Sequence, residues 1–135
     1  MGNIASLLIN LDTEKLKRRP TVKMEVKRLS ELLGEPAIIT VQAIPPKRYM
    51  EYAANVFGKN GEPNAAKMYE AMKMVAISGL VEPSMKDKDA MEKHGCSTPE
   101  ELIELVFTAA EIQTIGTKIT EISGMTGDTI KEIKN

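Results

Sequence analysis

The sequence predicts an α+β fold that is mostly helical, with an N-terminal β-hairpin packed against five or six helices. Strict alternation of apolar and polar residues occurs early in the chain, where Val22, Met24 and Val26 are separated by charged residues. From Pro46 onward, apolar residues recur at the three- and four-residue spacing of amphipathic helices. A length of 135 residues suits one domain, so we expect residues 1–135 to form a single domain.

The composition favours a soluble protein of a reducing compartment. The formal net charge is −1, which marks the chain for neither nucleic acid nor a membrane surface. One cysteine cannot build an internal disulfide framework. No apolar stretch approaches the roughly 20 residues that span a bilayer. We therefore expect a cytoplasmic protein without a membrane partner, with a core of aliphatic residues and methionine because tryptophan is absent.

Residues 1–20 are expected to form an N-terminal helix or arm. Ile4, Leu7, Leu8 and Leu11 have the i, i+3, i+4, i+7 spacing of one helix face. This spacing predicts a short amphipathic helix that docks its apolar stripe on the rest of the protein.

The hairpin is predicted from residues 22–26 and 37–44. Gly34 and Pro36 indicate a turn between them, so the two strands are expected to pair through a longer loop. A lone hairpin is only marginally stable in water, so helices must cover one of its faces.

The helices are predicted over residues 46–57, 64–80, 84–94, 98–106 and 108–123, with glycines after several of them. Two of them carry clear start signals. Thr98 and Glu101, and again Thr108 and Glu111, have the spacing at which a hydroxyl and a carboxylate cap a helix start. Residues 125–135 are expected to be a final frayed turn or a flexible tail.

The methionine-rich stretch 67–85 suggests a partner-binding surface. Met68 and Met72 share a face with Val75, which indicates core filler. Met74 and Ile77 point elsewhere and give the helix a second apolar face. Such a helix is either central to the domain or covered by a partner, including a second copy of the chain. Met74 and Ile77 are therefore the predicted partner-binding residues.

No residue pattern predicts catalysis, a cofactor or a metal site. His94 and Cys96 are two residues apart, but two ligands do not make a zinc site, and Gly95 already explains the segment as a helix end. The acidic residues at 100, 101 and 104 lie at a helix start, where the helix dipole favours them. We expect a protein that is not an enzyme.

A basic segment, residues 15–28, offers an alternative function. Seven cations stand against one acidic residue, Glu25, so a small nucleic-acid-associated regulatory domain is conceivable. No aromatic residue interleaves to stack on bases, which favours a solvated charged face instead. The cations are Lys15, Lys17, Arg18, Arg19, Lys23, Lys27 and Arg28.

From about residue 20 to 135 the chain resembles the XkdN-like phage tail assembly chaperones. The resemblance is carried by Leu80–Pro83 (LVEP), Gly95, Thr98–Glu100 (TPE) and Glu111–Ile112, in that order. The segment TAAEI at 108–112 departs from the pattern, where a glycine would precede the glutamate.

The resemblance implies a non-enzymatic protein that binds the long, helical tape measure protein before the tail tube polymerises around it. It also implies a protein of the host cell cytoplasm that is absent from the mature virion. Many such systems make a longer form by frameshifting, whose added domain recruits tail tube protein. Ile133-Lys134-Asn135 could be encoded by AUA AAA AAC, which contains a slippery heptamer, and other codons there would exclude this hypothesis.

Overall fold

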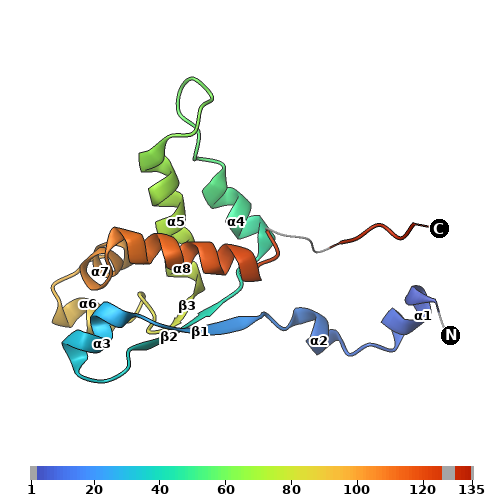
Figure 1. Cartoon of the computed structure of the whole chain (residues 1–135), viewed down its shortest axis with the longest axis horizontal. Coiled ribbons are helices and arrows are strands. Elements are labelled where there is room, and N and C mark those ends of the chain that lie inside the picture. The colour runs from blue at the N-terminus through green and yellow to red at the C-terminus, as the bar shows by residue number, and fades with distance from the viewer. Residues whose placement is uncertain (1–2, 126–129, 135) are drawn as a thin grey trace.

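The computed structural model describes residues 3–125 and 130–134 (Figure 1). It confirms the predicted class: a mostly helical α+β fold with an antiparallel sheet. Two short helices precede the sheet, α1 (Ile4–Ile9) and α2 (Thr13–Lys17). The strands are β1 (Thr21–Glu25), β2 (Ile38–Gln42) and β3 (Leu80–Glu82). In the described part of the chain six helices follow β1: α3 (Lys27–Leu33), α4 (Pro46–Ala53), α5 (Ala65–Gly79), α6 (Lys88–Lys93), α7 (Pro99–Val106) and α8 (Ala109–Ile122).

The predicted hairpin is present, but it belongs to a sheet with the order β1-β2-β3. β1 and β2 pair antiparallel from Thr21↔Gln42 to Glu25↔Ile38. The connection predicted as a turn is a helix, α3, which Gly34 ends with a left-handed φ of 76°. β3 was not predicted, because LVE is short and reads as the end of the preceding helix. It pairs with β2 at Thr40↔Glu82 and Val41↔Leu80.

The hydrophobic core lies between the sheet and the helices. Ile39 and Val41 of β2 are buried on the face that α8 covers, whereas the opposite face carries the exposed Ile38. The largest fully buried side chains come from five segments of the chain and are aliphatic apart from one methionine, and Phe107 is buried beside them. They include Val41, Val75, Met85, Leu102, Ile103, Ile112, Ile115 and Ile119.

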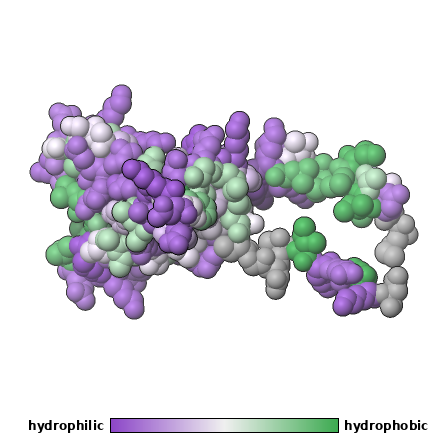
Figure 2. Space-filling model, turned by 90° about the horizontal axis from the view of Figure 1, so that it is seen from above, coloured by the Kyte–Doolittle hydropathy of each residue, from purple (hydrophilic) through white to green (hydrophobic). Residues whose placement is uncertain are grey.

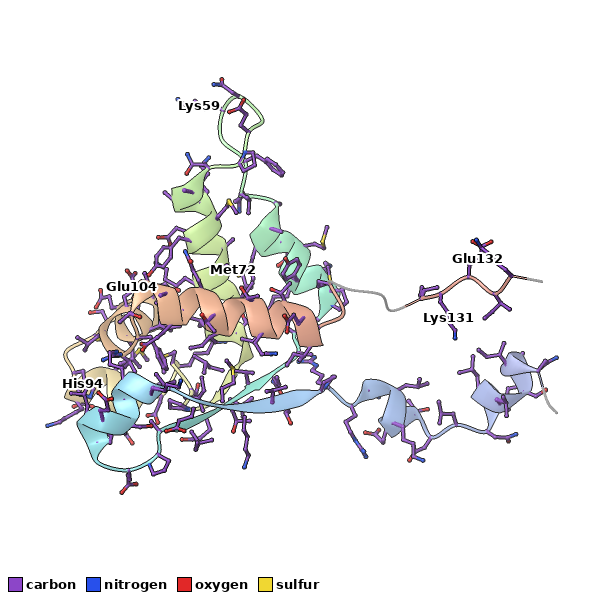
Figure 3. The ribbon with its side chains drawn as sticks, in the orientation of Figure 1. Lys59, Met72, His94, Glu104, Lys131 and Glu132 are labelled. Carbon is purple, nitrogen blue, oxygen red and sulfur yellow. The ribbon has the colours of Figure 1, made fainter. Side chains whose placement is uncertain are left out.

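Two glycines allow α5 and α8 to cross at close range. A Cβ on Gly116 would lie 2.8 Å from the sulfur and 2.9 Å from the carbonyl oxygen of Met72. A Cβ on Gly79 would overlap the side chain of Ile119. In Figure 3, Met72 lies where α8 passes α5. The C-terminal half of α5 is packed at this crossing, and the N-terminal half extends beyond α8 (Figure 1).

Two expectations for helices were wrong in part. α1 forms as predicted, but its apolar stripe is not docked, since every residue from 3 to 20 is exposed. α4 ends at Ala53 rather than next to Gly58, because the chain bends back and Phe57 forms a bridge with Pro63. The predicted tail is only partly described: residues 130–134 have no regular secondary structure, and 126–129 and 135 lie outside the described residues.

Candidate functional site

Helices α4 and α5 form a pair that projects from the body of the protein (Figure 1). α4 starts at Pro46, whose fixed φ suits the first turn of a helix. α5 starts after Asn64, whose side chain accepts a hydrogen bond from the amide of Lys67 at 3.1 Å. The loop between the helices is held by the amide of Asn64, which donates to the carbonyl of Val56 at 3.0 Å. The pair therefore has defined ends and a closed tip, which carries Lys59 (Figure 3).

An apolar groove of about 210 Å³ runs between α4 and α5. We call it the apolar groove. Met68 lies at its edge with 47% of its surface exposed, and Met50 and Phe57 on the same helix pair are also exposed. Three exposed apolar side chains therefore lie on this projecting pair and its connecting loop. The groove is lined by Tyr49, Ala53, Val56, Met68, Ala71, Met72 and Val75.

A second hollow of about 370 Å³ lies on the other side of the α4–α5 contact and shares Ala71 with the apolar groove. It is more polar, because Lys67 and Glu70 form part of its wall together with Met74. The hydroxyl oxygens of Tyr52 and Ser78 lie 2.7 Å apart and link α4 to α5. This side of the pair offers both apolar and charged contacts.

The structure separates the two residues predicted to bind a partner. Met74 is half-buried and lines the second hollow. Ile77 is 5% exposed and belongs to the hydrophobic core. The second apolar face of α5 is therefore largely covered by the protein itself, and only Met74 is carried into the proposal below.

Sequence reasoning missed Met68, Met50 and Phe57 as surface residues. Met68 was assigned to the core with Met72, but it is exposed because α5 extends beyond α8 at that height. Its place in the first turn after the Asn64 cap is a weak signal for the free end of a helix. Nothing in the sequence shows which part of α5 another helix covers.

A buried lysine fastens the base of the pair to α7. The Lys73 ammonium contacts the carboxylates of Glu70 and Glu104, each at 2.8 Å, and lies 5.6 Å from the centroid of the Tyr69 ring. Burial lowers the pKa of Lys73, but the hydrogen bonds from its ammonium to Glu104 and Glu70 outweigh it, so the pKa is raised overall. The lysine is thus held in its charged form and acts as a structural tie.

The basic segment is divided by the fold. Arg28 donates to both carboxylate oxygens of Glu111, at 2.9 and 3.1 Å, and to the carbonyl of Val106 at 2.7 Å. It thereby connects the start of α3 to the start of α8. The other six cations, at positions 15, 17, 18, 19, 23 and 27, have exposed side chains.

The His94–Cys96 segment ends a helix, as predicted. His94 is the C-terminal cap of α6 and Gly95 has a φ of 68°. Cys96 is a half-buried free thiol that packs against the core. Within residues 3–125 and 130–134, no group of three or more His, Cys, Asp or Glu side chains is placed to hold a metal ion. Across the same ranges, no helix has the length and apolar character needed to cross a membrane.

Comparison with known proteins agrees with the resemblance seen in the sequence. The family model of the phage XkdN-like tail assembly chaperone proteins matches residues 6–134. The crystal structure of the protein YqbN is similar over 77% of this chain and 86% of that one, with a TM-score of 0.51 and 23% sequence identity, which shows the likeness of fold alone. No curated protein matches the chain. Because the family model covers nearly all of the sequence, the chain belongs to the phage XkdN-like tail assembly chaperone family.

Proposed function

We propose that this protein binds the tape measure protein of its phage or prophage and keeps it soluble during tail morphogenesis. Membership of the tail assembly chaperone family supports this role. The role requires no catalysis, and its place is the host cytoplasm before the virion is complete. Residues 1–135 act as one tail-assembly-chaperone domain in this proposal, with residues 1–20 as an arm and 125–135 as a tail.

The observation that carries the proposal is the apolar groove on the projecting α4–α5 pair. A long helical client exposes apolar stripes until the tail tube encloses it, and a helix-in-groove contact covers such a stripe. From Met68 to Val75 the groove wall contains eight helical residues, a rise of about 10 Å, which is two turns of a bound helix. Two turns present three or four apolar side chains on one face, so each chaperone covers a short stretch of its client.

Methionine suits this task because its side chain adapts to different partners. A client that is bound at many points along its length presents a different set of side chains at each point. Met68 and Met72 in the apolar groove, and Met74 in the second hollow, have flexible unbranched side chains that can adjust to each set.

Co-expression tests the proposal. The tape measure protein should remain soluble with the wild-type chain and precipitate without it. Met68→Glu places a charge on the groove edge at an exposed position, so the fold should survive while binding weakens about tenfold or more. Leu32→Glu is the matched control, because Leu32 is also exposed but lies on α3, away from the groove.

Two results would count against the proposal. The first is a tape measure protein that is equally insoluble with and without the chaperone. The second is equal loss of binding in the Leu32→Glu control, which would show that added charge rather than the groove is responsible. A gel shift with random-sequence DNA tests the alternative function. If either result occurs and the wild-type chain also retards the DNA, a nucleic-acid-associated role of the basic segment is favoured.

A longer frameshifted form that recruits tail tube protein stays a proposal. Ile133 and Lys134 are exposed, and Asn135 lies outside the described residues. The codons of these three residues decide it.

A further inference from the structure

The N-terminal arm, residues 3–19, carries an apolar stripe that the chain itself leaves uncovered. Exposed fractions along the stripe are 73% for Ile4, 63% for Leu7, 49% for Leu8 and 37% for Leu11. The side chain of Asn3 caps α1 by accepting from the amide of Ser6 at 3.0 Å. Figure 2 shows these hydrophobic residues gathered on the arm, outside the body.

This stripe needs a covering surface. A helix of six residues is far too short to be stable alone in water, so α1 persists only where its apolar face is packed against something. Its polar residues, Asn3, Ser6 and Asn10, bond within the arm, which leaves the stripe for an apolar contact. The surface it needs is a groove of aliphatic and methionine side chains.

The apolar groove between α4 and α5 meets that need in length and chemistry. The helical part of the stripe, α1, has six residues, and the groove wall has eight residues of α5, from Met68 to Val75. At a rise of 1.5 Å per residue, the helix of the arm is about 8 Å long and the groove wall about 10 Å. Every lining side chain is apolar apart from the Tyr49 hydroxyl, as is every side chain of the stripe.

We propose that the arm of one copy docks its apolar stripe in the apolar groove of a second copy, and that two copies exchange arms reciprocally. The four exposed side chains of the stripe offer on the order of 300 Å² of apolar surface per arm. Two arms and the two grooves that receive them bury about 1,200 Å² in total, which reaches the lower end of the range for specific interfaces. Exchange of both arms is therefore sufficient for a dimer, whereas one arm alone is not.

The base of the arm directs it away from its own groove. The carbonyl of Pro20 accepts from the amide of Ala43 at 2.9 Å, which fixes the arm to the end of β2. Arg18 is extended (φ −63°, ψ 129°), and Arg19 is restricted to extended backbone because it precedes a proline. The arm consequently leaves the sheet away from the α4–α5 pair (Figure 1).

Disulfide trapping tests the exchange directly. Leu8→Cys and Met68→Cys are made on separate chains, each with Cys96→Ser, then mixed and oxidised mildly. A disulfide-linked heterodimer, formed faster than with Leu32→Cys in place of Met68→Cys, is the expected result. If the heterodimer forms no faster than this control, the proposal is overturned. A third chain carries both cysteines. If it closes an intramolecular disulfide while the mixture gives no heterodimer, the groove belongs to the chain's own arm instead.

Sedimentation equilibrium gives an independent readout. Leu8→Glu should weaken dimerisation at least tenfold, whereas Leu32→Glu should leave it unchanged. A wild-type chain that stays monomeric up to 100 µM, or equal weakening by both variants, would contradict the proposal. Neither experiment contains the tape measure protein, so failure here is distinct from failure of the proposed function.

Arm exchange also has a consequence that rests on the proposed function, because arm and client would share one groove. In the wild type, the docked arm would compete with the tape measure protein and lower its apparent affinity for the groove. Leu8→Glu removes this competition, so it should bind the tape measure protein more tightly than the wild type does. The dimer would thus protect the groove until the client arrives.

Discussion

At the scale of single residues, Glu111 caps the start of α8 and ties it to α3. Its carboxylate accepts from the amide of Thr108 at 2.9 Å while the Thr108 hydroxyl accepts from the amide of Glu111 at 3.2 Å, which completes a capping box at the start of α8. The same carboxylate pairs with Arg28. The hydrogen bonds from Arg28, and secondarily from Thr108, lower the pKa of Glu111 below its ordinary value of 4.5, against the opposing effect of burial.

This lowered pKa predicts a stability contribution that depends on pH. A carboxyl whose pKa is lower in the folded state stabilises the fold above its unfolded pKa, and this contribution is lost as the pH falls through the folded pKa. Glu111→Gln should lower the free energy of unfolding by about 1 kcal/mol at pH 7, because it removes the ion pair and weakens the cap. The deficit relative to wild type should shrink below about pH 4. Urea denaturation at pH 7 and pH 3 measures it, and a deficit that is equal at both values would contradict this account.

The capping residues were also the part of the structure most accessible to sequence reasoning. Thr108 and Glu111 form the predicted box, and Thr98 caps α7 by accepting from the amide of Glu101 at 3.2 Å. The Glu101 carboxylate, however, accepts from the amide of Ser97 rather than that of Thr98, at 2.8 Å. Such motifs are predictable because all their partners lie within four residues. The bond from Arg28 to Glu111 spans 83 residues and has no local signal.

At the scale of elements, the α5–α8 crossing holds the core together and determines how far α5 projects. At Gly116 a Cβ would meet the carbonyl oxygen of Met72. Sequence periodicity predicted both helices but not where they cross. A glycine within a helix either lowers helix stability or allows a close contact with another helix, and the sequence does not distinguish these two cases. β3 escaped prediction for a related reason: its three residues become a strand only through pairing with β2.

Gly116→Ala tests the close contact. In an exposed helix this change stabilises by about 1 kcal/mol. Here we expect a loss of about 1–3 kcal/mol, since the new methyl group would lie within 3 Å of the Met72 carbonyl oxygen, which cannot move freely. Thr117→Ala, at the next and exposed position, is the control and should change stability by less than about 0.5 kcal/mol. Thermal unfolding compares the two, and a more stable Gly116→Ala would show that the helices are not tightly packed.

At the scale of the whole molecule, the α4–α5 pair and the N-terminal arm both extend from a packed body and expose apolar side chains (Figures 1 and 2). The sequence predicted the helices of both, with α4 extended too far. It assigned Met68 and the stripe of the arm to packing within the protein, and Ile77 to a partner-binding surface. Amphipathic spacing identifies which face of a helix is apolar and leaves open what covers it. Ile77 and Met68 show both errors, since the first is buried and the second is exposed, the reverse of the expectation.

The central claim is that the apolar groove between α4 and α5 receives a helix of the tape measure protein. Hydrogen–deuterium exchange on the co-purified complex tests it most directly, with free chaperone at the same concentration as reference. We predict slower exchange in Pro46–Ala53 and in the N-terminal half of α5 when the client is bound, with little change in α3 and α6. Protection confined to the exposed face of the sheet or to residues 15–28, with α4 and α5 unchanged, would contradict the claim.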